Sequence, residues 1–93
     1  RTPHERSRLA QYVFLAPWCK EQTVMVIGCD TGQGVHTLAQ HGAAWVDALD
    51  TDALTIQHAR RHFAHEKVAY HVKSGDSVVM NKTYQRILCL NLL

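Results

Sequence analysis

The chain has 93 residues, of which 46% are hydrophobic and 19% charged, with only 5 glycines and 2 prolines. This composition is typical of one small globular domain and excludes a disordered chain or a coiled coil. The formal net charge is +2 with neutral histidines, which is too small to favour an anionic membrane or a nucleic acid as a partner.

The cysteines and the apolar runs indicate the cellular compartment in which the protein is expected. Cys19, Cys29 and Cys89 are widely spaced, without a C-x-x-C pair, which argues against a disulfide framework and a zinc ribbon. No apolar run reaches the ~18 residues of a membrane span, and the polar N-terminus is unlike a signal peptide. We therefore expect reduced thiols and a cytoplasmic protein. Because the chain starts with arginine, we also expect a processed or excised segment.

The first expected element is a helix within residues 1–18. The sequence Thr2-Pro3-His4-Glu5 fits a capping box, with Thr2 as the N-cap and a proline in the first turn. Pro17 is expected to end the helix, and Trp18 to pack where the chain turns. One apolar stripe at helical spacing is expected to face the core: Leu9, Tyr12, Val13 and Ala16.

Strands are expected where β-branched and apolar residues cluster. Residues 23–27, TVMVI, form an apolar run without alternation, which is typical of a strand buried on both faces of a parallel sheet. Cys89 is expected in the core because it lies within such a run. The other expected strands are residues 45–49, 68–72 and 84–90.

Two helices are expected between the first three strands. The first covers residues 35–41, with Gly42 as its C-cap. The second runs from Thr51 or Asp52, either of which could be the N-cap, to His65. The residues expected to face inward are Val35, Leu38 and Ala39 in the first helix, and Ile56, Ala59 and Phe63 in the second.

This alternation of strands and helices predicts the fold class. It favours an α/β protein with a parallel sheet and right-handed crossovers. In a doubly wound, Rossmann-like sheet the strand order is 3-2-1-4, and ligands bind beyond the carboxyl ends of the strands. Those ends are the glycine turn (residues 28–34), Asp50, Asp76 and Asn91.

The glycine turn is the most informative stretch of the sequence. Glycines let the backbone approach a ligand closely, and the helix that follows offers unpaired N–H groups and a positive dipole end. Asp50 ends the next strand 18 residues beyond Gly32, close to the ~20 expected for an acid that accepts hydrogen bonds from both hydroxyls of a ribose. This spacing favours a nucleotide site. The alternative is that Asp50 only caps the helix that follows it.

Two common phosphate-binding motifs do not fit. The dinucleotide fingerprint G-x-G-x-x-G fails from Gly28, because the third position is Asp30, and from Gly32, because the sixth is Thr37. No Gly-Lys-Ser or Gly-Lys-Thr follows the strand, so a P-loop is excluded. An unrelated nucleotide-binding α/β domain remains a further alternative.

The sequence VMVIGCDTGQG resembles motif I of the class I S-adenosylmethionine-dependent methyltransferases. The stretch VDALDTDALTIQHARRHF resembles their second strand, its acidic ribose-binding residue and the next helix. Weaker similarities cover VAYHVKSGDS and YQRILCLNLL, which resemble the third and fourth strands, and ERSRLAQYVFLAPWCKEQT, which resembles the helix before motif I. The resemblance implies one partial methyltransferase domain over residues 1–93.

The resemblance also implies where S-adenosylmethionine would bind. Asp50 would hold the ribose, Thr51 or Asp76 would lie near the adenine, and Asn91 would face the transfer centre. No catalytic residue and no metal ligand is assigned, and the methyl acceptor is not specified. The implied cofactor-binding residues are Gly28, Cys29, Asp30, Gly32, Gly34, Asp50, Thr51, Asp76, Ser77 and Asn91.

Two residues depart from the family pattern. Val26 replaces the acid two residues before the first glycine, and Asp30 replaces the middle glycine. A side chain at Asp30 would crowd the cofactor, and its charge would oppose the methionine carboxylate. Two functions therefore remain: the cofactor-binding half of a methyltransferase, or a non-catalytic scaffold or partner-binding module that has lost the cofactor.

The end of the chain predicts a further partner. The family sheet has seven strands, whereas we expect this sheet to stop after the fourth. Residues 84–93 are strongly apolar and would form a hydrophobic edge strand, which pairs readily with another chain. We expect the remainder of a parent chain or an oligomer partner to cover this edge.

Two side-chain patterns have alternative interpretations. His58, His62 and His65 are spaced to lie on one helix face, either as a transition-metal site or, as we favour, as a solvated polar face. Cys29 is either a reactive thiol near a helix N-terminus or a small residue that the turn requires.

Overall fold

The computed structural model describes residues 3–74 and 83–89, and side chains from Arg8 onward. The predicted Thr2 cap and the predicted cofactor residues Asp76, Ser77 and Asn91 lie outside this part of the chain. Its elements are α1 (Pro3–Cys19), β1 (Thr23–Ile27), α2 (Gln33–Gln40), β2 (Trp45–Asp50), α3 (Ala53–His62), β3 (Val68–Val72) and β4 (Arg86–Leu88).

The strands form the predicted parallel sheet. Their order is β3-β2-β1-β4, and every pairing is parallel. In the register, Thr23 pairs with Trp45 and Val46 pairs with Val68. The fold class, a Rossmann-like α/β sheet in the order 3-2-1-4, is therefore confirmed for the described residues.

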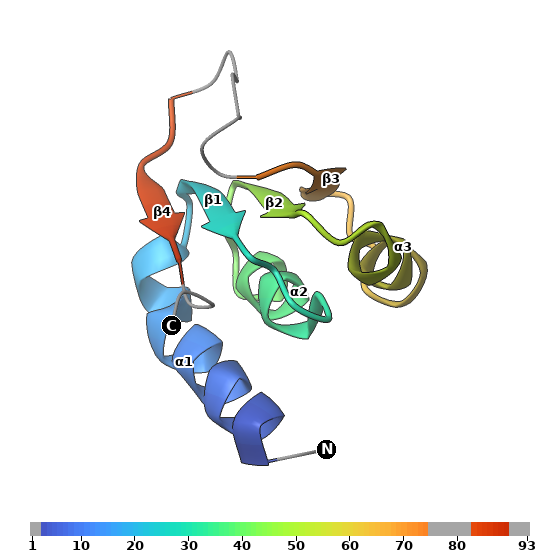
Figure 1. Ribbon diagram of the computed structural model, residues 1–93. Coiled ribbons are helices and arrows are strands. Elements are labelled where there is room, and N and C mark those ends of the chain that lie inside the picture. Colours follow the sequence, from blue (N-terminus) through green and yellow to red (C-terminus); the bar gives the residue numbers. More distant parts are fainter. Residues whose placement is uncertain (1–2, 75–82, 90–93) are drawn as a thin grey trace.

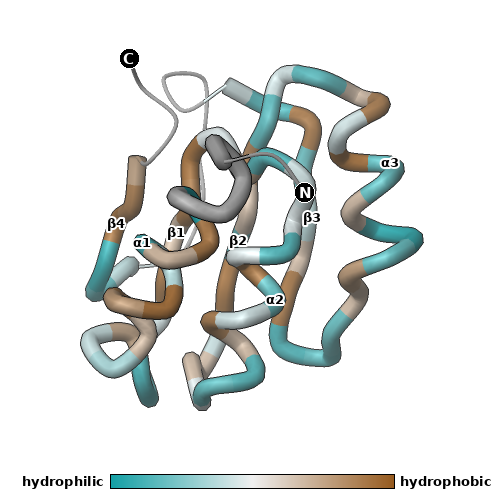
Figure 2. The backbone as a smooth tube through the Cα atoms, turned by 90° about the horizontal axis from the view of Figure 1, so that it is seen from below, coloured by the Kyte–Doolittle hydropathy of each residue, from teal (hydrophilic) through white to brown (hydrophobic). Residues whose placement is uncertain are grey.

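All three described helices lie on the same side of this sheet (Figure 1). Figure 2, seen from that side, shows the helices in front of the strands. The core fills the space between the two layers. Its buried side chains include Tyr12, Ala16, Val24, Val26, Val35, Leu38, Val46, Ala48, Ile56, Ala59 and Tyr70.

This one-sided arrangement corrects the expectation for the first strand. In β1, Val24 and Val26 are fully buried under the helices, whereas Thr23, Met25 and Ile27 are only partly buried. The apolar run therefore does not reflect equal burial on both faces, because the described helices cover only one of them. In β2 four consecutive residues, 46–49, are buried.

The first helix differs from its prediction in both its end and its face. It continues through Pro17 to Cys19, which is buried. Pro17 lacks an N–H and so removes one helix hydrogen bond, but the extra residues bring Cys19 into the core. The carbonyl of Cys19 then accepts a hydrogen bond from the amide of Gln22 at 3.0 Å. Val13 and Trp18 are 51% and 62% exposed and do not pack as predicted.

The other helix ends follow local hydrogen bonds. The C-cap of α2 is His41 rather than the predicted Gly42, and the helix covers Gln33–Gln40 instead of residues 35–41. Gly42 follows the cap at φ +100° and donates its N–H to the carbonyl of Ala39. Asp52 is the N-cap of α3, because its side chain accepts from the amide of Leu54 at 2.9 Å. The helix ends at His62, where the Phe63 carbonyl accepts from the Tyr70 hydroxyl.

The fourth strand is shorter than predicted. It covers Arg86–Leu88 instead of residues 84–90. Tyr84 precedes it, with its hydroxyl 2.6 Å from a carboxylate oxygen of the buried Asp47. Cys89 is exposed, contrary to the prediction that it lies in the core. No helix within residues 3–74 and 83–89 has both the length and the apolar character to cross a bilayer.

Gly34→Ala tests the packing of α1 against α2. A Cβ at position 34 would collide with the ring of Tyr12, which is 2% exposed and has little room to yield. We expect the free energy of unfolding to fall by about 1–3 kcal/mol, as in other overpacked cores. This loss would occur even though alanine is otherwise favoured over glycine in a helix. Urea denaturation followed by circular dichroism measures it.

The control is the same substitution in a Tyr12→Ala background. Removing the ring makes room for the new Cβ, so Gly34→Ala should cost less there than in the wild type. A Gly34→Ala chain as stable as the wild type would contradict this account of the packing.

Candidate functional site

The glycine turn is fixed to the carboxyl end of β2. The backbone N–H groups of Gly28 and Cys29 both donate to the carbonyl of Leu49, at 2.8 and 3.2 Å. Leu49 immediately precedes Asp50, the last residue of β2. These two hydrogen bonds therefore bring the start of the turn and Asp50 to adjacent positions on one edge of the sheet.

Asp50 shapes the connection to α3 without capping that helix. Its Oδ1 accepts a hydrogen bond from the amide of Asp52 at 2.9 Å, whereas the helix amide of Leu54 is capped by Asp52. Among the described residues, no other hydrogen bond reaches the Asp50 carboxylate. The alternative in which Asp50 only caps the next helix is therefore wrong, and Oδ2 remains able to accept from a ligand. Thr51, beside it, is exposed.

Asp30 adopts a backbone conformation that normally favours glycine. Its φ is +56°, in the left-handed region, which costs most residues about 1–2 kcal/mol and aspartate less. Its Oδ2 accepts from Nη1 of Arg8 at 3.0 Å. The two side chains are 37% and 18% exposed, so solvent partly screens the pair. The ion pair connects the turn to α1 and offsets the charge of Asp30.

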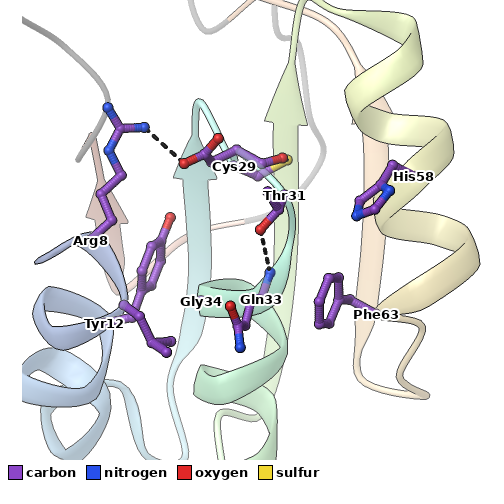
Figure 3. A pocket seen from close by; sticks show the side chains of 10 residues that line it. Arg8, Tyr12, Cys29, Thr31, Gln33, Gly34, His58 and Phe63 are labelled. Atoms are coloured by element: carbon purple, nitrogen blue, oxygen red, sulfur yellow. Dashed lines mark hydrogen bonds and ion pairs between the residues drawn. The ribbon is translucent and has the colours of Figure 1, made fainter. Parts of the chain in front are cut away.

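A pocket of about 160 Å³ lies between α1, the glycine turn and α3 (Figure 3). It is smaller than the roughly 300–1,000 Å³ of most ligand sites, so it has room for a small polar group but not for a whole nucleoside. A wider pocket of about 280 Å³ adjoins Asp30 and the start of α3. The smaller pocket is lined by Arg8, Leu9, Tyr12, Cys29, Asp30, Thr31, Gln33, Gly34, His58 and Phe63.

Packing accounts for two of the glycines. A Cβ on Gly32 would lie 2.7 Å from the Cβ of Ala59, and one on Gly34 would meet the Tyr12 ring. The hydroxyl of Tyr70 also donates to the Gly32 carbonyl at 3.4 Å. The helices thus require both glycines whether or not a ligand binds.

Cys29 has the environment of a structural thiol. It is 1% exposed. Burial raises the pKa of its thiol to about 12, and the charges of Asp50 and Asp30 act in the same direction. The predicted alternative of a reactive thiol is not supported, because a thiol that stays protonated is a poor nucleophile.

The three histidines of the sequence pattern do not share one helix face. The ring centroids of His58 and His62 are 4.6 Å apart, but His65 lies beyond the end of α3 and packs against His36 at 5.6 Å. In the described part of the chain, no group of three or more His, Cys, Asp or Glu residues could hold a metal ion. The helix-face pattern therefore does not support a metal site.

Sequence reasoning missed the role of Arg8. The charge pair between Arg8 and Asp30 spans 22 positions of the sequence, so no local pattern indicates it. One indirect signal exists: Arg8 lies one helical turn before Tyr12 and therefore shares the face that meets the turn.

Solved structures indicate the fold family. No protein-family model matches the sequence, and no curated protein matches it significantly. The N-methyltransferase NodS from Bradyrhizobium japonicum WM9 has a TM-score of 0.76 and 19% identity, over 92% of this chain and 49% of that one. A putative S-adenosylmethionine-dependent methyltransferase from Listeria monocytogenes has a TM-score of 0.71 and 22% identity, over 86% of this chain and 40% of that one.

The chain has the fold of part of an S-adenosylmethionine-dependent methyltransferase. A third structure, coclaurine N-methyltransferase bound to N-methylheliamine and S-adenosylhomocysteine, has a TM-score of 0.69 and 24% identity, over 91% of this chain and 26% of that one. NodS has also been solved with S-adenosylhomocysteine. The chain thus spans less than half the length of each of these proteins.

Alkylation tests the environment of Cys29. At pH 8 we expect iodoacetamide to label the exposed Cys89 first and to leave Cys29 unmodified, because a pKa of about 12 leaves only about 10⁻⁴ of that thiol ionised. Peptide mass spectrometry after brief labelling measures this order, and the same chain in urea is the control in which all cysteines react. Equal labelling of Cys29 and Cys89 in the folded chain would contradict it.

Proposed function

We propose that this chain is the cofactor-binding part of a methyltransferase and binds S-adenosylmethionine at the carboxyl edge of β1 and β2. The observation that carries the proposal is the attachment of the glycine turn to Leu49, which sets the turn beside the available Oδ2 of Asp50. The hydroxyls of a ribose bound at this edge would donate hydrogen bonds to the Asp50 carboxylate. The adjacent glycine turn would approach the same ligand closely, because its glycines carry no side chains.

The proposed roles follow the resemblance, residue by residue. Gly28, Gly32 and Gly34 shape the turn, Asp50 accepts hydrogen bonds from the ribose, and Thr51 lies near the adenine. The proposed roles of Asp76, Ser77 and Asn91 fall outside the described residues and rest on the resemblance alone. The two structures with S-adenosylhomocysteine support a cofactor site in this fold.

The ion pair of Arg8 with Asp30 bears on the main objection to this proposal. An isolated aspartate at the middle glycine position would oppose the carboxylate of the cofactor. With Arg8 at 3.0 Å, the two charges nearly cancel, so the turn presents no net negative charge to the ligand. The loss of the acid at position 26 has no such compensation, because Val26 is fully buried and apolar.

The proposed mechanism assigns positioning to this chain. S-adenosylmethionine, when bound, supplies a methyl group on a sulfonium sulfur, which a nucleophile of the acceptor attacks in line. The turn and Asp50 would hold the cofactor so that its reacting end is presented in one orientation, which lowers the entropy cost of the encounter. We further propose that the protein is cytoplasmic.

A second function is favoured by a different observation. Packing against Ala59 and Tyr12 accounts for Gly32 and Gly34, and Val26 cannot do what the family acid does. The same fold could therefore persist as a non-catalytic scaffold or partner-binding module. For either function we propose that β4, where Ile87 is 57% exposed, is covered by the rest of a parent chain or by an oligomer partner.

Titration of S-adenosylhomocysteine into Asp50→Asn and Asp52→Asn distinguishes the two functions. Each variant removes one negative charge, and asparagine is also a good N-cap at position 52. We expect Asp50→Asn to weaken binding about tenfold, because charge-assisted hydrogen bonds to the ribose are lost. Asp52→Asn should stay within about twofold of the wild type, since Asp52 caps α3. Calorimetry measures both affinities.

Equal weakening in the two variants would contradict the ribose role of Asp50. A folded wild-type chain that binds no S-adenosylhomocysteine would favour the scaffold function.

A further inference from the structure

The positive charge of the chain is concentrated in one stretch of the sequence. Residues 58–73 contain four lysines and arginines against a single acid, Glu66, which gives a formal charge of +3 with neutral histidines. The rest of the chain contains six lysines and arginines against seven acids and carries −1. The small net charge of the whole chain therefore does not describe this stretch.

The fold places these cations along one outer edge of the sheet. The helix α3 and the edge strand β3 lie at the end of the sheet opposite α1 and β4 (Figure 1). Two of the cations, Arg60 and Arg61, are in the last turn of α3, where the helix dipole favours them. The other two lie outside the helix and flank β3, roughly 20 Å apart along the strand. We call this set the cationic edge; its exposed members are Arg60, Arg61, Lys67 and Lys73.

The backbone of β3 is partly closed to a further strand. Alternate residues of a parallel strand bond to the neighbouring strand, and Lys67 and Lys73 are among those that bond to β2. The carbonyl of Tyr70 therefore points away from β2, where Nη2 of Arg60 donates to it at 2.6 Å. Charged side chains on an edge strand disfavour pairing with another strand. This edge thus offers a partner its cationic side chains rather than its backbone.

These cations are available to an anionic ligand. Neither ion pair of the described residues, Arg8 with Asp30 or His71 with Asp47, involves the cationic edge. No hydrogen bond within the described part of the chain reaches the side-chain nitrogens of Arg61, and the same holds for the two lysines.

A lipid surface does not fit this edge. Helices that bind membrane surfaces combine cations with large apolar or aromatic side chains that enter the bilayer. The exposed aromatic side chains in the described part of the chain, Phe14 and Trp18, are on α1. Figure 2 shows α1 beside β4 and far from α3, so these anchors are not next to the cations.

We propose that the cationic edge binds the phosphate backbone of a nucleic acid without reading its sequence. A row of cations without acidic partners is complementary to a row of phosphates, and their contact releases counterions. An acidic peptide would most readily add to β3 as a further strand, which the bond of Arg60 to the Tyr70 carbonyl opposes. This inference does not depend on the proposed cofactor site.

The test is the binding of fluorescently labelled polyuridylate to the chain, followed by anisotropy between about 50 and 200 mM salt. Four phosphate contacts predict a slope of about −3 for the logarithm of the association constant against that of the salt concentration. Arg61→Gln and Lys67→Gln should each weaken binding about three- to tenfold at about 50 mM salt and make this slope shallower by about 0.7. These side chains are exposed, and circular dichroism verifies that each variant is folded.

Lys20→Gln is the charge-matched control. Lys20 is also exposed but follows α1, away from the cationic edge, so this variant should bind as the wild type does. Equal weakening by Lys20→Gln would overturn the inference, because it would indicate an effect of net charge rather than of this edge.

Three further probes decide the class of partner. Duplex DNA shows whether one strand or two are preferred, and binding of either form supports the inference. Polyglutamate and phosphatidylserine vesicles test the other anionic partners. If the folded wild type binds neither nucleic acid at low salt, or binds polyglutamate or the vesicles at least as tightly, the inference is overturned. The proposed cofactor site is unaffected by each of these results.

Discussion

The close approach of two helices to the glycine turn is the constraint on which the rest of this structure depends. Tyr12 of α1 packs against Gly34, and Ala59 of α3 packs against Gly32, at distances that leave no space for a Cβ. These contacts fix both helices on one side of the sheet. They also hold the turn on the side of the helices, while the carbonyl of Leu49 holds it on the side of β2 by hydrogen bonds. A turn anchored in this way is preorganised, and binding a ligand there would cost little further ordering.

The charges follow from the same anchoring. Because Tyr12 fixes the face of α1 that meets the turn, Arg8, one helical turn earlier, reaches Asp30. An aspartate with a positive φ would otherwise add backbone strain and an unpaired charge to the site. The ion pair with Arg8 offsets the charge that Asp30 adds to the site. The other N–H groups of the guanidinium and Oδ1 of Asp30 have no further partner among the described residues. The structure thus pairs the charge on which the sequence-based objection to Asp30 rests.

Much of the fold could be predicted, because it depends on local patterns. The runs of apolar residues predicted β1 and β3 at their observed bounds, and the alternation of elements predicted the strand order. The errors concern neighbours distant in sequence. Periodicity alone could not tell that Cys19, rather than Val13, would face the core. The sequence also predicted correctly that Asp50 and the glycine turn lie at one edge of the sheet. It did not predict the ion pair of Arg8 with Asp30, since no local rule links residues so far apart.

The central claim is that the glycine turn and Asp50 form one preorganised cofactor site. The most direct test is a titration of the isotopically labelled chain with S-adenosylhomocysteine, followed residue by residue by two-dimensional NMR. The account predicts that amide shifts move together at residues 28–34 and 50–52, with one common dissociation constant, while the outer face of α1 around Phe14 does not respond. Shifts confined to other residues, or none in a folded chain at millimolar ligand, would contradict it.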